Sequence, residues 1–277
     1  NLVPSNHFYR KLESKLDLRF IRERVQERYA NHGRPSIDPV VFFKLQLIMF
    51  FEGIRSERQL MDVVNVNVAH RWYIGYDLDE QVPDHSALSK IRDRYGLETF
   101  QFFFEHIVEQ CFAAGLVWGK ELYFDGTKIQ ANADFDKVVP RFEFVAQQHL
   151  ETLFDKVEAR TAPPLSFVEQ YDGRRLLSSR THSTQGRQAD THTCTTDPDA
   201  TPLYSQPDHS RLGYNLHYVI DGGKARIILG ALVTPACIQD NTPMLDIERW
   251  VRFRWEIDPV IAVADKKYGT LSNIVGL

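Results

Sequence analysis

Apolar and polar residues follow two different patterns along the chain, and the pattern changes near residue 116. Before that point apolar residues recur every three or four positions with charged residues between them, which is the period of an α-helix. After it come short apolar runs bounded by glycine, proline and polar residues, which are typical of β-strands. The pattern predicts an α/β protein with an all-helical domain over 1–116 and a domain of mixed strands and flanking helices over 117–277.

The early part of the helical domain contains a clear helix start. Residues 11–29 have apolar residues at helical spacing, which predicts one helix. Asp38 is a suitable N-cap, and Pro39 suits the first helical position. Residues 40–51 are apolar on most sides, so we expect a central core helix there.

A second start lies at Ser56, because Ser56 and Gln59 fit a capping box. The connection to the preceding helix is short, so a helix-turn-helix is possible. Arg55 and Arg58 would then lie at the exposed start of its second helix, where DNA is contacted. A plain helical hairpin with solvated charges is the alternative.

A third start lies at Asp84, another suitable N-cap. Three basic residues follow at close spacing, namely Lys90, Arg92 and Arg94. They would be able to meet DNA phosphates, although Asp93 among them makes a solvated, mixed face the alternative. A separate, strongly apolar helix is expected over 97–114.

Two apolar runs in the second domain each lead to an aspartate. Residues 122–124 predict a short strand that ends at Asp125, and residues 260–264 predict a central strand, buried on both faces, that ends at Asp265. Two rigidly held carboxylates suit a two-metal site, in which cations about 3.5–4 Å apart activate a nucleophile and stabilise a leaving oxygen. The alternative is that each aspartate caps a strand or begins a turn.

The remaining pattern predicts the order of the sheet. Residues 214–220 alternate as a half-buried strand, 221–223 form a hairpin turn, and 225–233 form the returning strand. A helix over 243–252 precedes the run that ends at Asp265. We therefore expect three strands, a helix and a fourth strand, with an acid on the first and fourth strands.

A partly irregular insertion is expected at about 134–210, helical at first and then rich in Ser, Thr, Pro, Asp and His. Four of its arginines have no acidic residue between them, namely Arg174, Arg175, Arg180 and Arg187. They predict either a DNA-contacting arm or a solvated loop. The insertion also contains His182, His192, Cys194 and His209, whose spacing matches no standard zinc pattern.

Composition changes this picture in two respects. The three cysteines of the 277 residues are scattered, and no signal segment or membrane-spanning run is seen, so we expect a cytoplasmic protein with no membrane partner. The net charge of −4 and the sequence pI of about 6.2 disfavour a uniformly basic DNA-binding domain. Any DNA contact must therefore rest on one basic face.

Several separated segments resemble bacterial insertion-sequence transposases of the DDE type, in the order of that family. Tyr-Phe-Asp125-Gly-Thr-Lys-Ile-Gln-Ala-Asn-Ala resembles the first acidic motif, and Ala-Val-Ala-Asp265-Lys-Lys-Tyr-Gly resembles the second. Residues 2–10, 32–44 and 83–95 are similar to segments of the family's helical amino-terminal domain.

The resemblance implies an RNase H-like catalytic domain that cuts and joins double-stranded DNA at transposon terminal inverted repeats and in target DNA. It implies that Asp125 and Asp265 bind two Mg²⁺ or Mn²⁺ ions and that the protein works as a homo-oligomer on nucleoid DNA. Three lysines next to these acids would position phosphates, or else simply face solvent: Lys128, Lys266 and Lys267. Tyr268 and Gly269 also match the second motif, without an assigned chemistry.

One part of the family pattern is missing. The third acidic residue of the family is a Glu on a helix well beyond the second Asp, and no residue here matches it. We therefore expect a carboxy-terminally incomplete domain that is weak or inactive by itself. The alternatives are a non-catalytic DNA-binding remnant of a mobile element and an RNase H-like repair nuclease with no preference for inverted repeats.

Overall fold

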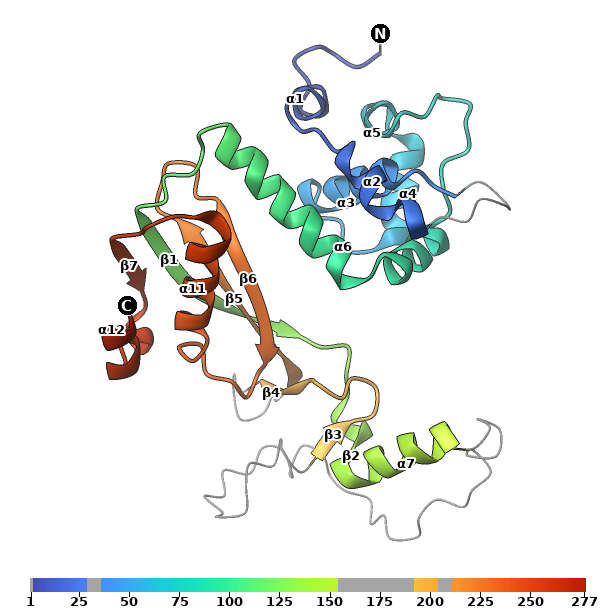
Figure 1. The fold of residues 1–277 in the computed structure, drawn as a ribbon. Helices are drawn as coiled ribbons and strands as arrows, with labels where there is room; N and C mark the ends of the chain where they lie inside the picture. The colour runs from blue at the N-terminus through green and yellow to red at the C-terminus, as the bar shows by residue number, and fades with distance from the viewer. Residues whose placement is uncertain (1, 29–35, 154–191, 204–210) are drawn as a thin grey trace. The chain divides into compact units, whose positions relative to one another are not determined.

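A computed structural model describes residues 2–28, 36–153, 192–203 and 211–277, which Figure 1 shows as a coloured ribbon. The chain divides into two compact units, Asn1–Ala114 and Gly115–Leu277. We call them the helical unit and the sheet unit, and describe each by itself. The first contains helices, and the second contains a mixed sheet with helices, so the predicted α/β class is confirmed.

The helical unit is built around α3. Its α-helices are α1 (Phe8–Lys15), α2 (Phe20–Val25), α3 (Pro39–Phe51), α4 (Glu57–Val66), α5 (Val68–Ile74) and α6 (His85–Ala113), and the 3₁₀ helix η1 spans Gln26–Arg28. The predicted cap of α3 is confirmed, because Asp38 Oδ1 accepts a hydrogen bond from the Val40 N–H at 2.8 Å. Phe42, Leu45 and Ile48 on α3 are fully buried, as expected for a core helix.

The prediction of one helix over 11–29 is wrong. Helix α1 ends at Lys15, and Leu16 is extended, with φ −105° and ψ 110°. The Asp17 carboxylate then accepts a hydrogen bond from the Arg19 N–H at 2.9 Å. An Asp side chain that binds a nearby backbone N–H competes with continuation of the helix, so α2 starts only at Phe20.

Helix α6 contains a break where a separate helix was expected to begin. Gly96 has φ 67° and ψ 173°, a conformation that favours glycine, and helical residues continue on both sides. The Arg28 Nη1 group donates to the Arg94 carbonyl at 2.8 Å and also to the Tyr95 carbonyl. These bonds satisfy carbonyls near the break. The label α6 thus covers two helices that meet at a kink at Gly96, so the expected separate helix after Gly96 is confirmed.

The sheet unit contains a five-stranded sheet. Its strands are β1 (Glu121–Gln130), β4 (Thr201–Leu203), β5 (Arg211–Asp221), β6 (Ile228–Pro235) and β7 (Ile261–Ala264). The order β4-β5-β1-β7 is parallel only at β1 and β7, and β6 pairs antiparallel with β5. Helix α11 (Met244–Trp255) lies between β6 and β7 in sequence, so the predicted order of three strands, a helix and a strand is confirmed, with β4 added.

A smaller substructure follows β1. It consists of η2 (Phe135–Lys137), β2 (Val138–Pro140), α7 (Arg141–Leu153) and β3 (His192–Cys194). Phe135, Val138 and Cys194 are buried together there with Leu212 of β5. Strands β3 and β4 lie in a region that was expected to be irregular. The four arginines proposed as an arm, together with His182 and His209, lie outside the described residues.

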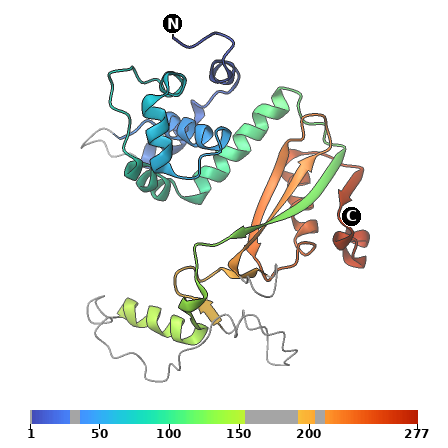
Figure 2. The same ribbon diagram turned by 180° about the vertical axis from the view of Figure 1, so that it is seen from behind.

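The two faces of the sheet differ. Side chains alternate along a strand, and the face that carries Leu122, Phe124 and Val219 is buried. Helix α11 lies across the sheet in Figure 1, and in Figure 2 the opposite face is seen with no described helix of the sheet unit over it. Successive side chains point to opposite faces of a strand, so Asp125 lies on the face opposite Phe124, together with Tyr123. This is the open face.

Two strand predictions need correction. Strand β1 does not end at Asp125 but continues to Gln130, because its polar second half pairs with β5. Strand β7 is not buried on both faces; Ile261, for example, is 49% exposed. It is an edge strand in the described sheet and is followed by the 3₁₀ helix η3 (Lys266–Tyr268) and α12 (Leu271–Gly276). An apolar run alone does not reveal how many neighbours a strand has.

Candidate functional site

Asp125 and Asp265 occupy equivalent positions on adjacent strands. Strands β1 and β7 run parallel, and Phe124 pairs with Ala264. Asp125 is the next residue on β1, Asp265 is the first residue after the end of β7, and neighbouring strands are about 4.8 Å apart. Both aspartates line one open cavity of about 470 Å³, together with Tyr123, Phe124, Ile220, Arg226, Val263 and Ala264. The fold therefore brings together two carboxylates that are 140 positions apart in sequence.

The Asp125 carboxylate is held by its own strand and by β5. Its Oδ1 accepts a hydrogen bond from the Gly126 N–H at 2.8 Å, and its Oδ2 accepts one from the Tyr218 hydroxyl at 3.1 Å. Tyr218 is paired with Asp125 across the two strands, so both side chains emerge on the open face. Partial burial and the Asp125 carboxylate raise the pKa of Tyr218, which therefore remains a neutral donor.

Asp265 has a different environment. It occupies the N-cap position of η3, yet its side chain makes no capping hydrogen bond there. The residue is exposed, and its backbone is extended with φ −61° and ψ 154°. This geometry counts against the reading in which Asp265 only caps a turn. It leaves the carboxylate directed at the cavity that Asp125 also lines.

Arg226 brings a positive charge to the same cavity. It belongs to the β5–β6 hairpin, has φ 54°, and places its guanidinium carbon 4.5 Å from the centroid of the Tyr123 ring. A non-glycine residue in this conformation is uncommon and marks a position worth attention. Neither Arg226 nor Tyr218 lies in a local sequence motif, so neither was predicted as a site residue. Strand pairing brings Tyr218 to Asp125 and places Arg226 at the cavity.

A metal site can be assessed from the donors that are present. Among the described residues no three His, Cys, Asp or Glu side chains lie close enough to hold a metal ion together. Asp125 and Asp265 thus form a pair of hard oxygen donors on one face. Mg²⁺ accepts one or two protein carboxylates when water and substrate phosphates complete its shell, so the pair fits this ion.

The three lysines near the pair are placed differently. Lys266 and Lys267 are exposed in η3, directly after Asp265. Lys128 is exposed on β1, three residues after Asp125, so its side chain starts from the opposite face of the strand. Of the three lysines, Lys266 and Lys267 thus lie in the segment that directly follows Asp265, a residue of the cavity lining.

Glu57 at the start of α4 links that helix to α6. Its carboxylate accepts a hydrogen bond from the Ser89 hydroxyl at 2.7 Å and forms an ion pair with Arg92. The start of α4 and the first half of α6 therefore lie side by side. Arg55, Arg58 and Lys90 are exposed on these segments, whereas Arg94 donates to the Ser36 hydroxyl at 3.4 Å. The two basic groups that the sequence suggested thus belong to neighbouring helices.

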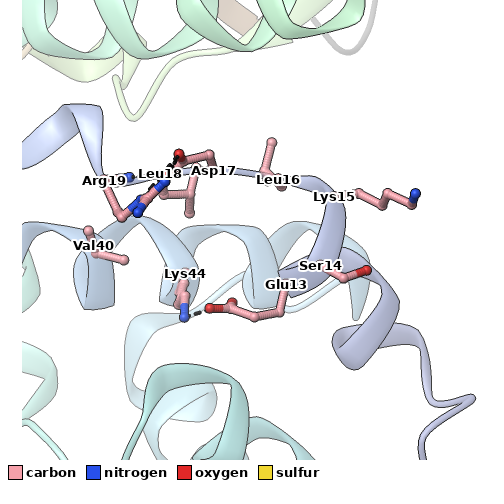
Figure 3. A pocket seen from close by; sticks show the side chains of 9 residues that line it. All are labelled: Glu13, Ser14, Lys15, Leu16, Asp17, Leu18, Arg19, Val40 and Lys44. Carbon is pink, nitrogen blue, oxygen red and sulfur yellow. Dashed lines mark hydrogen bonds and ion pairs between the residues drawn. The ribbon is translucent and has the colours of Figure 1, made fainter. Parts of the chain in front are cut away.

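Another cavity of about 280 Å³ lies in the helical unit, beside α1 and α3 (Figure 3). Four of its charged residues form two ion pairs. Lys44 lies 2.7 Å from Glu13, and Arg19 lies 2.7 Å from Asp17. The Arg19 guanidinium also holds the pKa of the Asp17 carboxyl down to about 2. These four charges compensate each other, which leaves Lys15 as the remaining charged residue of the lining.

Two of the four residues considered for zinc are described, and they lie on the same short strand. Cys194 is buried, and its thiol donates to the Asp134 carbonyl at 3.5 Å. His192 precedes it by two residues and is partly exposed. The Cys194 thiol thus contributes to the small core around Phe135.

Similarity to a known protein family indicates the class of protein. The model of the family described as "Transposase domain (DUF772)" matches residues 1–94, which lie within the helical unit. This match supports a transposase, and hence a protein that acts on DNA. The matched segment contains Arg55, Arg58, Lys90, Arg92 and Arg94 but neither Asp125 nor Asp265. No curated protein and no solved structure matches the chain.

Among the described helices none is both long and apolar enough to cross a lipid bilayer.

Proposed function

We propose that the chain is a transposase of the DDE type, and that Asp125 and Asp265 are two of its metal-binding carboxylates. The observation that carries this proposal is that each aspartate directly follows one member of the pair Phe124–Ala264, which joins the adjacent parallel strands β1 and β7. The order of strands around them, β6-β5-β1-β7 with α11 before β7, is the one expected of an RNase H-like domain. The transposase match over 1–94 supports a transposase, though not the DDE type in particular, independently of the sheet unit.

The residues in and next to the cavity would have different roles. Asp125 and Asp265 would hold one or two Mg²⁺ or Mn²⁺ ions, which when bound supply Lewis-acid activation of the nucleophile and of the phosphodiester. The Tyr218 hydroxyl would orient the Asp125 carboxylate through its 3.1 Å hydrogen bond. Arg226, stacked on Tyr123, would neutralise a DNA phosphate at the cavity wall.

The helical unit would supply DNA affinity. Arg55 and Arg58 at the start of α4 and Lys90 on α6 are exposed and lie on neighbouring helices. Contacts from such residues to phosphates would position transposon-end DNA, and their number would set the salt dependence of binding. Lys266 and Lys267 would add contacts close to Asp265.

The test is direct metal binding by the 277-residue chain. Mn²⁺ titration followed by electron paramagnetic resonance should show binding that Asp125→Asn and Asp265→Asn each abolish or greatly weaken. Asp246→Asn is the matched control, because Asp246 is an exposed carboxylate in the first turn of α11, away from the pair. Equal Mn²⁺ binding by all four proteins would rule out the proposed site.

A non-catalytic DNA-binding protein is the second candidate. The observation that favours it is the position of the family match, which is confined to the helical unit. Such a protein would bind DNA equally well with EDTA or with Mg²⁺, and Asp125→Asn would leave all its properties unchanged. Binding to labelled transposon-end DNA and nicking of that DNA, both measured with and without Mg²⁺, separate the two functions.

A further inference from the structure

Tyr268 is buried in a segment that is otherwise mostly exposed. From Ile261 to Leu277 only Tyr268 and Asn273 are buried, and Asp265, Lys266 and Lys267 are all exposed. Strand β7 pairs with β1 over four residues only, and the pairing stops at Ala264. The backbone that carries Asp265 therefore needs another anchor on the sheet.

The Tyr268 side chain reaches β1 next to Asp125. Its hydroxyl lies 3.4 Å from the point that a Cβ atom on Gly126 would occupy, and the Asp240 Oδ1 lies 3.7 Å from the same point. Gly126 directly follows Asp125 and faces the other side of the strand. The Tyr268 side chain, which begins three residues after Asp265, therefore approaches β1 at Gly126, on the face opposite Asp125.

The backbone around Tyr268 is fixed as well. Its N–H donates to the Asp265 carbonyl at 2.9 Å, and its own carbonyl accepts from the Asn273 side-chain amide at 2.9 Å. The same amide donates to the Asn241 carbonyl at 3.0 Å. The turn after Asp265 is thus joined through Asn273 to Asn241, which precedes α11.

The hydroxyl is not what holds the ring. Within the described part of the chain the buried Tyr268 hydroxyl has no hydrogen-bond partner. Burial raises its pKa to about 12, and the negative charges of Asp240, Asp125 and Asp265 contribute to this shift. Tyr268 is therefore neutral near pH 7 and lies within electrostatic reach of both aspartates. The anchoring contribution comes from the ring.

We infer that Tyr268 is a positioning residue whose ring clamps the segment after β7 onto β1 and so fixes the separation between Asp125 and Asp265. This inference rests on the proposed function for its link to metal binding, but the clamp itself does not require a metal. Loss of the ring would free the Asp265 carboxylate to move relative to Asp125. Residues that orient metal ligands typically change metal affinity by about 10–100-fold when removed.

The experiment compares Tyr268→Ala with Tyr268→Phe in the 277-residue chain. Amide hydrogen exchange, followed by mass spectrometry of peptides from 261–277, should be faster in Tyr268→Ala and unchanged in Tyr268→Phe. Mn²⁺ affinity should fall by about 10–100-fold in the first variant and stay within about twofold in the second. Tyr268→Leu, which removes the ring but keeps a smaller apolar side chain, should behave like Tyr268→Ala and serves if that variant does not fold.

Phe135→Ala is the matched control for loss of a buried ring. Phe135 is 4% exposed and packs in the separate cluster around Val138 and Cys194. Its loss should lower stability without changing exchange over 261–277 or Mn²⁺ affinity. Wild-type exchange in Tyr268→Ala would overturn the clamp, and faster exchange with unchanged Mn²⁺ affinity would overturn its role in spacing. If the wild type binds Mn²⁺ no better than Asp125→Asn, the proposed function fails, while the exchange data still decide on the clamp.

Discussion

Tyr218 on β5 and Asp125 on β1 are joined across the sheet by a hydrogen bond of 3.1 Å, in which the hydroxyl donates to the carboxylate Oδ2. The two residues are direct cross-strand partners. The bond therefore depends on the register of the two strands, and a shift by one residue would turn the Tyr218 side chain to the opposite face. The environment of Asp125 is set by the pairing of β1 with β5 as much as by the motif around it.

Tyr218→Phe tests this relationship. The variant keeps the ring and removes the donor, so the Asp125 carboxylate loses its only side-chain partner among the described hydrogen bonds. We expect Mn²⁺ affinity to fall by about tenfold, as for other residues that orient metal ligands, with little change in the thermal midpoint. Titration calorimetry on both proteins measures the difference. Tyr214→Phe is the control, because Tyr214 donates to Asp197 rather than to Asp125.

Stability at high pH should depend on Tyr268. Its pKa is raised from the ordinary value of 10.0 to about 12 in the folded chain. The neutral form therefore contributes stability that is complete below about pH 10 and is lost as the pH rises towards 12. Urea unfolding at several values between pH 8 and pH 11 should show a smaller alkaline loss in Tyr268→Phe than in the wild type. Identical pH dependence would mean that the hydroxyl is not buried as described.

DNA binding should depend on the start of α4. Arg55→Ala and Arg58→Ala should each weaken binding and reduce the slope of log K against log salt by about one, as expected when one phosphate contact is lost. Fluorescence anisotropy with duplex DNA at several salt concentrations gives this slope. Arg19→Ala is the control, since Arg19 is exposed but already paired with Asp17 at 2.7 Å. Equal slopes for all these proteins would place the DNA contact elsewhere.

Gly213 should be intolerant of any side chain. A Cβ atom there would lie 2.2 Å from the Ile129 carbonyl oxygen and 2.4 Å from Leu203 Cδ1. The backbone atom cannot move aside without breaking the β1–β5 pairing, so Gly213→Ala should lower the free energy of unfolding by at least about 1–3 kcal/mol. In Gly126→Ala the nearest atom would be 3.4 Å away, an ordinary contact. Urea unfolding of the two variants should therefore differ clearly.

Local signals in the sequence predicted much of the helical unit. Asp38 and Asp84 cap their helices through hydrogen bonds to N–H groups two residues away, and Ser56 caps α4 from three residues away. Such contacts are contained within a short stretch and can be predicted from residue type. The break after Lys15 was missed, because the apolar spacing continues through it.

The strands were harder to predict where their partners are distant. The second half of β1 is polar and was not expected to continue the strand, yet it pairs with β5 residues more than 80 positions away. The short strands β3 and β4 form in the same way, against β2 and β5. The contacts of Arg226 and Tyr218 with the cavity depend on this pairing too. No local pattern contains that information.

The continuation of β1 past Asp125 gives the sheet unit a two-stranded ribbon of fixed length. Five further residue pairs, from Gly126–His217 to Gln130–Gly213, extend the β1–β5 ribbon beyond the aspartate. At about 3.4 Å per residue this ribbon is about 17 Å long, which equals the rise of about five base pairs of duplex DNA. The residues that follow Gln130 therefore begin about 17 Å along the ribbon from Asp125. Lengthening or shortening β1 and β5 together would change this distance.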